Sequence, residues 1–248
     1  MKIIDVYNVI NTLAPFSSAE EWDNCGLLVG SFEEDCSTAV VCLDVTNEVI
    51  NQAIENKAEL IISHHPIIFD PIKSIGFESK IAKLIKNNIS VISAHTNLDI
   101  AQNGVNDILC ERLGFKISES FADAFGRICT FEKETNAEDL ARLVKEKLSS
   151  KELTFIDAKN TITKVAICSG SGSSLVQEVI DKKVDAYITG ELKHNVMIEL
   201  YEENISVIMA GHFSTEVVIS SVLTNRLNEI LPQIKFISAM ETPLVSEV

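Results

Sequence analysis

A chain of 248 residues is long enough for one large domain or two modest ones, and its 46% hydrophobic and 23% charged residues are an ordinary globular composition. The formal net charge of −15 argues against broad binding to nucleic acids or to anionic membranes. No apolar run approaches the roughly 20 residues that a membrane-spanning helix needs.

The cysteines and the first residues of the chain predict a cytoplasmic protein with reduced thiols. None of the six cysteines has Cys-x-x-Cys spacing, and several lie in strand-like runs, where a free cysteine behaves as a small hydrophobe. The first six residues carry an acid inside an apolar stretch, which is not the layout of a signal peptide. We therefore expect a protein of the reducing cytoplasm.

Apolar runs and amphipathic segments alternate along the chain. The expected strands are residues 27–29, 38–45, 58–62, 89–94, 126–131, 153–156, 162–168, 187–189 and 206–210. The expected helices are residues 6–13, 46–57, 80–86, 103–113 and 137–148, followed by a helix and a strand within residues 215–239. This order predicts an α/β fold made of two α/β units with mixed, mostly parallel sheets.

The pattern of expected strands and helices changes after Phe115, although no linker rich in proline, glycine or serine marks the change. We place the domain boundary near residue 125. The first α/β domain is then expected to span residues 1–125 and to be joined by residues 208–248. The second α/β domain is expected to span residues 126–207.

An internal repeat relates the two parts of the chain. Residues 88–95 read Asn-Ile-Ser-Val-Ile-Ser-Ala-His, and residues 204–212 read Asn-Ile-Ser-Val-Ile-Met-Ala-Gly-His. Residues 58–65 and 184–191 precede these segments and have a matching layout. The repeat predicts a pair of βαβ units whose polar strand ends face one cleft.

Polar residues follow the expected strands at their carboxyl ends, which is where open α/β sheets bind ligands. His64 and His65 are adjacent, so they point to opposite faces of a strand and serve different ions only if the chain bends there. Two further pairs have the i, i+4 spacing that puts both side chains on one helix face. These pairs are His95 with Asp99 and His212 with Glu216.

Histidine and carboxylate together suit zinc, iron, manganese or nickel rather than calcium. Five or more such groups exceed what one catalytic ion takes, whereas two divalent ions bridged by a carboxylate would use them. We expect His95 to move protons or to brace Asp99, and His194 to be a polar residue at a helix start. The predicted metal ligands are His64, His65, Asp99, His212 and Glu216.

The chain resembles the GTP cyclohydrolase I type 2 homolog family, also described as the Ngg-interacting-factor-like family. The resemblance rests on five motifs whose order and rough spacing hold along the chain. These motifs are residues 22–30, 62–66, 95–99, 188–191 and 211–216. The resemblance implies a two-domain α/β fold and a toroidal homohexamer. It also implies a dinuclear metal site with the five predicted ligands, of which Glu216 bridges the two ions.

The metal ligands predict a di-metal-dependent hydrolase, in which metal lowers the pKa of a bound water and polarises the bond under attack. The resemblance adds a GTP cyclohydrolase-like reaction on a nucleotide or a related small molecule. The alternative is a non-catalytic metal-binding or regulatory protein that is oligomeric and uses the same ligands. A pocket beside the metals would favour the enzyme, and a closed coordination shell would favour the alternative.

Two further segments each have two interpretations. The glycine-containing loop at residues 168–174 binds a phosphate through backbone N–H groups, or it is a tight left-handed turn. Trp22, Asp23 and Asn24 line a pocket, or they form a buried tryptophan followed by an Asx turn.

Overall fold

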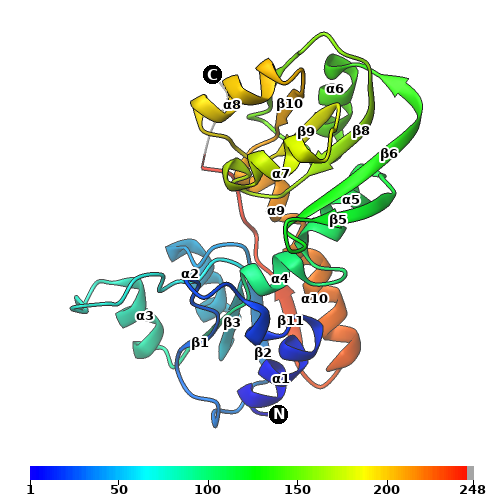
Figure 1. Ribbon diagram of the computed structural model, residues 1–248. Coiled ribbons are helices and arrows are strands. Elements are labelled where there is room, and N and C mark those ends of the chain that lie inside the picture. The colour runs from blue at the N-terminus through cyan, green and yellow to red at the C-terminus, as the bar shows by residue number, and fades with distance from the viewer. Residues whose placement is uncertain (245–248) are drawn as a thin grey trace. The chain divides into compact units, whose positions relative to one another are not determined.

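The computed structural model describes residues 1–244 and divides the chain into two compact units (Figure 1). The first unit comprises Met1–Gln102 and Ile219–Thr242, and the second comprises Asn103–Val218 and the described residues from Pro243 onward. Within residues 1–244, no helix has the length and apolar character needed to cross a bilayer. The predicted α/β class is confirmed, with one mixed sheet in each unit.

The first unit is built on a five-stranded sheet with the order β1-β4-β3-β2-β11. All neighbours are parallel except β1, which runs antiparallel to β4 at one edge. The strands are β1 (Gly26–Val29), β2 (Thr38–Cys42), β3 (Leu60–Ser63), β4 (Ser90–Ser93) and β11 (Lys235–Ser238). The helices are α1 (Ile3–Leu13), η1 (Phe16–Ser18), α2 (Asn47–Glu55), α3 (Lys80–Lys86), α4 (Thr96–Ile100) and α10 (Val218–Ile230).

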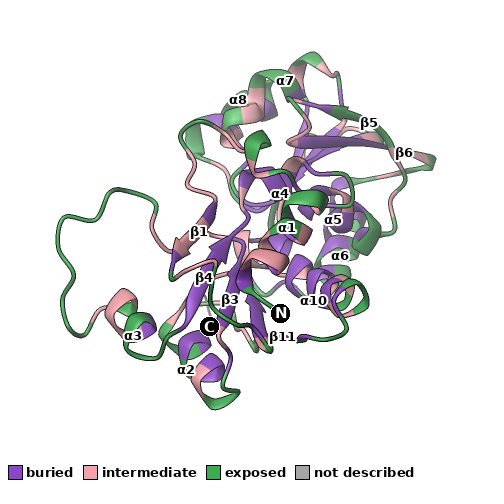
Figure 2. Ribbon diagram, turned by 90° about the horizontal axis from the view of Figure 1, so that it is seen from below, coloured by how far each residue is buried: buried purple, intermediate pink, exposed green. Residues whose placement is uncertain are grey.

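Strands β3 and β4 are buried at every position, as their continuous apolar runs predict for parallel strands covered on both faces (Figure 2). The two helices on either side of β3 each start after a capping hydroxyl. The Thr46 hydroxyl accepts from Val49 N–H at the start of α2, and the Ser79 hydroxyl accepts from Ala82 N–H at the start of α3. Between β3 and α3 the chain has no regular structure, and residues 69–78 are exposed.

The second unit has a six-stranded sheet with the order β5-β6-β8-β9-β10-β7. Only β8, β9 and β10 are mutually parallel. The strands are β5 (Ile117–Phe121), β6 (Gly126–Thr135), β7 (Thr154–Ile156), β8 (Ile162–Ile167), β9 (Ala186–Thr189) and β10 (Ser206–Met209). The helices are α5 (Val105–Leu113), α6 (Ala137–Leu148), η2 (Ser173–Leu175), α7 (Val176–Asp181), α8 (His194–Glu202) and α9 (His212–Glu216).

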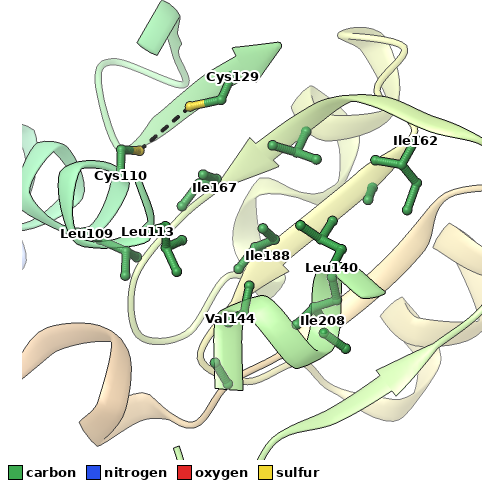
Figure 3. Close-up of a cluster of buried hydrophobic side chains, with 14 of the residues drawn as sticks. Leu109, Cys110, Leu113, Cys129, Leu140, Val144, Ile162, Ile167, Ile188 and Ile208 are labelled. Carbon is green, nitrogen blue, oxygen red and sulfur yellow. Dashed lines mark hydrogen bonds between the residues drawn. The ribbon is translucent and has the colours of Figure 1, made fainter. Parts of the chain in front are cut away.

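The unit boundaries differ from the predicted ones. Helix α5 was expected in the first domain, but its buried Leu109 and Leu113 pack in one apolar cluster with Ile167 and Ile188 of the second sheet (Figure 3). The boundary therefore lies at Gln102 rather than near residue 125. The chain also returns to the first unit at Ile219 rather than at residue 208, because β10 pairs with β9 and α9 follows it.

The C-terminal segment was expected to pack on the first unit, and most of it does. Strand β11 pairs in parallel with β2, and α10 belongs to the same unit from Ile219 onward. However, His212 and Glu216 lie on α9, which belongs to the second unit. The predicted ligands are therefore carried by both units.

The predicted pair of βαβ units is confirmed. Strand β4 pairs with β3 in the same register as β10 with β9, with Leu60 opposite Ser90 in one and Ala186 opposite Ser206 in the other. Before each second strand an asparagine adopts the left-handed conformation, at φ 53° for Asn88 and φ 57° for Asn204. Asparagine tolerates this conformation after a helix end better than most residues. The shared five-residue sequence thus encodes the same helix-to-strand turn twice.

A carboxylate fixes the start of each pair of strands. Glu59 accepts hydrogen bonds from Ser37 N–H at 3.0 Å and from Thr38 N–H at 3.0 Å, next to β2. Asp185 accepts from Thr163 N–H and from Lys164 N–H, both at 2.8 Å, in β8. Burial alone would raise the pKa of Glu59, but these hydrogen bonds outweigh it and hold the pKa below its usual 4.5.

We expect Glu59→Ala to lower the free energy of unfolding by about 1 kcal/mol, because two backbone donors lose a charged acceptor. Chemical denaturation at neutral pH measures this difference. The depressed pKa stabilises the folded protein above pH 4.5, and this contribution is lost as the pH falls through the lowered value. The difference between wild type and variant should therefore shrink in acid.

Glu55→Ala is the matched control, because Glu55 is an exposed acid at the end of α2. We expect this change to shift the free energy of unfolding by less than about 0.5 kcal/mol. If both substitutions had an equal effect, the loss of a negative charge would account for it, and the hydrogen bonds from Ser37 and Thr38 to Glu59 would not.

Candidate metal centre

The chain bends directly after β3, at the two adjacent histidines. The hydroxyl of Ser63 donates to the carbonyl of His65 at 2.8 Å, which closes a turn over His64. The two rings consequently lie near each other, with centroids 5.0 Å apart, instead of on opposite faces of a strand. The chain therefore has the bend that the sequence analysis required for the two histidines to serve different ions.

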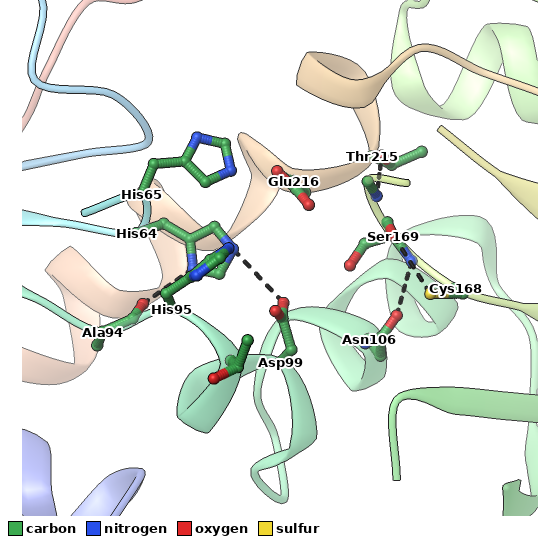
Figure 4. Close-up of polar contacts among 12 residues, drawn as sticks. His64, His65, Ala94, His95, Asp99, Asn106, Cys168, Ser169, Thr215 and Glu216 are labelled. Atoms are coloured by element: carbon green, nitrogen blue, oxygen red, sulfur yellow. Dashed lines mark hydrogen bonds and ion pairs between the residues drawn. The ribbon is translucent and has the colours of Figure 1, made fainter. Parts of the chain in front are cut away.

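A third histidine lies beside this pair. The ring centroid of His95, which follows β4, is 5.1 Å from that of His64 and 5.5 Å from that of His65. The three residues each offer a ring nitrogen, and these nitrogens lie within 4.8 Å of one another. We call these three residues the histidine cluster; Figure 4 shows them side by side.

Each ring of the histidine cluster is held through its Nδ1. His64 Nδ1 lies 2.9 Å from the carbonyl oxygen of Ala94, and His65 Nδ1 lies 2.9 Å from Asp44 Oδ1. His95 Nδ1 lies 3.0 Å from Asp23 Oδ1. All three acceptors are oxygens, so the hydrogen belongs on Nδ1 and the lone pair on Nε2. Histidines that bind metal are typically oriented by such a bond from the opposite nitrogen.

Asp99 adds a carboxylate to the histidine cluster. It lies on α4 and is 8% exposed, and its Oδ1 is 3.4 Å from His64 Nε2. Helix α4 begins at His95, whose carbonyl accepts from Leu98 N–H and Asp99 N–H. The predicted i, i+4 spacing thus holds Asp99 and His95 on the same short turn. Three imidazoles and one carboxylate form a donor set that suits zinc, iron, manganese or nickel.

Asp23 is a buried acid beside the histidine cluster. Its fully buried side chain accepts from His95, from Thr96 N–H at 3.1 Å, from the Thr96 hydroxyl at 2.5 Å and from Asn24 N–H at 2.8 Å. Burial would raise its pKa, but the hydrogen bonds from His95, Thr96 and Cys25 outweigh burial and hold the pKa far below its usual value. Asp23 is therefore ionised and fixes the ring of His95.

The second unit carries a similar arrangement on α9. His212 Nδ1 lies 3.2 Å from Glu191 Oε1, and its Nε2 lies 3.0 Å from Glu216 Oε2. Glu216 is only 5% exposed, whereas the side chain of Glu191 is 60% exposed. The predicted i, i+4 pair thus lies on one helix face, and Glu191 orients His212 from the outer side.

The loop at residues 168–174 supports this carboxylate. Gly170 has φ 59°, and a Cβ placed on it would lie 2.1 Å from Glu216 Oε1. Its N–H donates to the Thr215 hydroxyl at 3.0 Å, and Ser169 N–H donates to Asn106 Oδ1 at 2.8 Å (Figure 4). These two N–H groups are already bonded within the unit, and the positive φ of Gly170 favours the tight left-handed turn over a phosphate site.

Trp22 is not the buried residue that one interpretation expected, because it is 60% exposed. Asp23 and Asn24 direct their polar groups inward, and Asn24 Nδ2 donates to the Ile68 carbonyl at 2.6 Å. The carboxylate of Asp23 and the Nδ2 of Asn24 are therefore bonded within the unit, which disfavours the pocket that the other interpretation required. His194 is the exposed first residue of α8, as expected for a polar helix-start residue.

Sequence reasoning found every histidine of the two arrangements but missed two of the acids that orient them. Asp44 lies two residues after the end of β2, and its place near a strand end was a usable signal. Asp23 lies in a loop before β1, and nothing in its spacing connects it to His95. The role of His95 stays a prediction, and its ring lies among the candidate ligands.

We expect Asp23→Asn to leave metal affinity within a few-fold of wild type, because Asp23 orients His95, which is not one of the five predicted ligands. Competition with a coloured chelator for zinc or manganese measures the affinity, and the exposed Asp35→Asn is the matched control. A loss of about tenfold to a hundredfold in Asp23→Asn alone, which the loss of a ligand's orienting partner typically causes, would show that His95 is itself a ligand.

The chain matches known proteins along nearly all of its length. A curated relative from Clostridium acetobutylicum, named GTP cyclohydrolase 1 type 2 homolog, is 37% identical over 246 residues and covers 92% of each chain. A crystal structure of a hypothetical protein from Staphylococcus aureus has a TM-score of 0.90 at 28% identity, covering 100% of this chain and 99% of that one. Reduced HcgD from Methanocaldococcus jannaschii has a TM-score of 0.84 at 31% identity, covering 96% and 97%.

A family model described as Duf34/NIF3 (NGG1p interacting factor 3) matches residues 1–243. This match agrees with the resemblance that the five sequence motifs carried, and with the curated relative named above. The chain therefore belongs to the Duf34/NIF3 family.

Proposed function

We propose that this protein is a di-metal-dependent hydrolase. The observation that carries the proposal is that every ring of the histidine cluster is already oriented by an oxygen on its Nδ1. The proposed ligands of two divalent ions, which are zinc, iron, manganese or nickel, are His64, His65, Asp99, His212 and Glu216. In this proposal the carboxylate of Glu216 would be shared between the two ions.

Bound metal supplies a water of lowered pKa and polarises the bond to be cleaved. The residues of the chain orient the histidine rings and move a proton. Asp44 and Glu191 keep the hydrogens of His65 and His212 on Nδ1, and Asp23 does the same for His95. In this proposal His95 accepts a proton at Nε2 while Asp23 stabilises the resulting imidazolium.

A nucleotide or a related small molecule is the proposed substrate, in a GTP cyclohydrolase-like reaction of the cytoplasm. The support is the name of the Clostridium acetobutylicum relative, GTP cyclohydrolase 1 type 2 homolog. The second candidate function is a non-catalytic metal-binding or regulatory protein. The proximity of three imidazoles and Asp99 favours this second function, because four protein ligands fill the coordination shell of one ion and leave no open position for a substrate.

We expect Glu216→Gln to lose at least one metal ion per chain with the fold retained. The substitution keeps the size of the side chain but removes the charge that offsets both ions. Elemental analysis measures metal content, and circular dichroism measures the fold. Hydrolysis of nucleotides, GTP first, should fall with the metal and return when metal is restored to the wild-type apoprotein.

Glu199→Gln on α8 is the control, because it removes an exposed acid from the same unit. It should keep both metals. If Glu216→Gln binds two ions as tightly as wild type, the bridging role is wrong. If wild type binds two ions but hydrolyses no nucleotide tested, the regulatory alternative gains.

We also propose that the protein is a homohexamer, as the family resemblance implies, with apolar surface buried between copies. Ile72, Ile75 and Phe77 are 44%, 54% and 85% exposed and lie on the same irregular segment. Apolar interfaces must outweigh the repulsion of a net charge of −15 per chain. Light scattering at micromolar concentration should give the mass of six chains, and a monomer would refute the assembly.

A further inference from the structure

Trp22 is a large aromatic side chain that the fold leaves in solvent. Its ring lies 6.4 Å from that of His95, at an interplanar angle of 78°, and 5.9 Å from that of Phe69, at 46°. Trp22 is 60% exposed, and Phe69 is 51% exposed. Two neighbouring exposed aromatic rings thus stand at the side of the histidine cluster. We call Trp22 and Phe69 the aromatic platform.

The backbone that carries Trp22 is held on both sides. Before it, Glu20 N–H donates to the Thr96 hydroxyl at 3.0 Å. After it, Asp23 is bonded to His95 and Thr96, and Asn24 Nδ2 donates to the Ile68 carbonyl next to Phe69. An exposed ring on an anchored segment is pre-organised, and its ordering adds little to the entropy lost when a ligand binds.

The stability of the fold does not account for this arrangement. Burying a tryptophan stabilises a protein far more than exposing one, and Trp22 gives up most of that gain. A single exposed apolar residue needs no explanation, but an anchored pair of aromatic rings beside a candidate metal centre points to a ligand.

We infer that the aromatic platform stacks against a planar heteroaromatic ring of the substrate, such as a nucleobase. The inference rests on the proposed hydrolase function, because it holds the ring beside the histidine cluster. Stacking on an aromatic face tolerates every base, since each base has a π-face.

The polar residues next to the aromatic platform indicate which planar rings it can accept. The Asp23 side chain is fully buried and bonded to His95 and Thr96, and Asn24 Nδ2 donates to the Ile68 carbonyl. These groups are therefore not directed at the hydrogen-bonding edge of a stacked ring. The platform therefore recognises a flat ring by shape, and we expect purine nucleotides to bind with similar affinities.

Trp22 reports on this inference directly, because it is the only tryptophan of the chain. Metal-loaded protein is titrated with guanosine 5′-monophosphate, adenosine 5′-monophosphate and ribose 5-phosphate, which lacks the ring. We expect saturable quenching of tryptophan fluorescence by both purine nucleotides at similar concentrations and no quenching by ribose 5-phosphate.

Calorimetry on variants tests the stacking itself. Trp22→Ala should weaken the binding of both nucleotides by about tenfold to a hundredfold, the range expected for loss of one base–aromatic stack. Trp22→Phe keeps a flat ring and should lose only a few-fold. Tyr201→Ala removes a ring that is 52% exposed on α8, and it should leave the affinity unchanged.

The outcomes separate this inference from the proposed function. Absence of quenching at millimolar nucleotide, or nucleotide affinity unaffected by Trp22→Ala in protein with full metal content, overturns the platform. A change of oligomeric mass in Trp22→Ala without a change in affinity also overturns it, because the ring is then covered by another copy. If metal-loaded wild type binds nucleotides more tightly than Trp22→Ala but hydrolyses none of them, the platform is supported and the hydrolase is rejected.

Discussion

The candidate centre depends on hydrogen bonds from histidine Nδ1 atoms to oxygens that the sheets hold in place. Ala94 follows strand β4 directly and Asp44 comes two residues after strand β2, so the ends of the sheet fix both acceptors. Such a bond sets the direction of the ring and the tautomer, with the lone pair on Nε2. The parallel strands place these groups together, because their carboxyl ends meet at one edge.

The sequence alone was sufficient to predict the strands around the candidate metal centre. The apolar runs predicted β3, β4, β9 and β10, and the structure places all four within a residue or two of the expected positions. The i, i+4 spacing of His212 and Glu216 was equally informative, because it depends only on local helix geometry. Local patterns carried these predictions, and none of them required knowledge of distant contacts.

Tertiary contacts account for what sequence reasoning missed. Helix α5 has the composition of any amphipathic helix, and only packing of Leu109 and Leu113 against the second sheet assigns it to that unit. Asp23 and His95 are 72 positions apart in the chain, and no periodicity joins a loop acid to a strand-end histidine. The exposure of Trp22 was also hidden, because a tryptophan between polar residues reads equally as core or surface.

Asp23 joins two tasks in one carboxylate, since it orients His95 and anchors the backbone that carries Trp22. A substitution at this position would disturb the candidate ligand and the aromatic surface together. A substitution at Trp22 changes only a side chain in solvent and leaves those hydrogen bonds intact. A single mutation at residue 22 can therefore change the exposed aromatic surface during evolution. Residue 23 is constrained twice, by the orientation of His95 and by the backbone that carries Trp22.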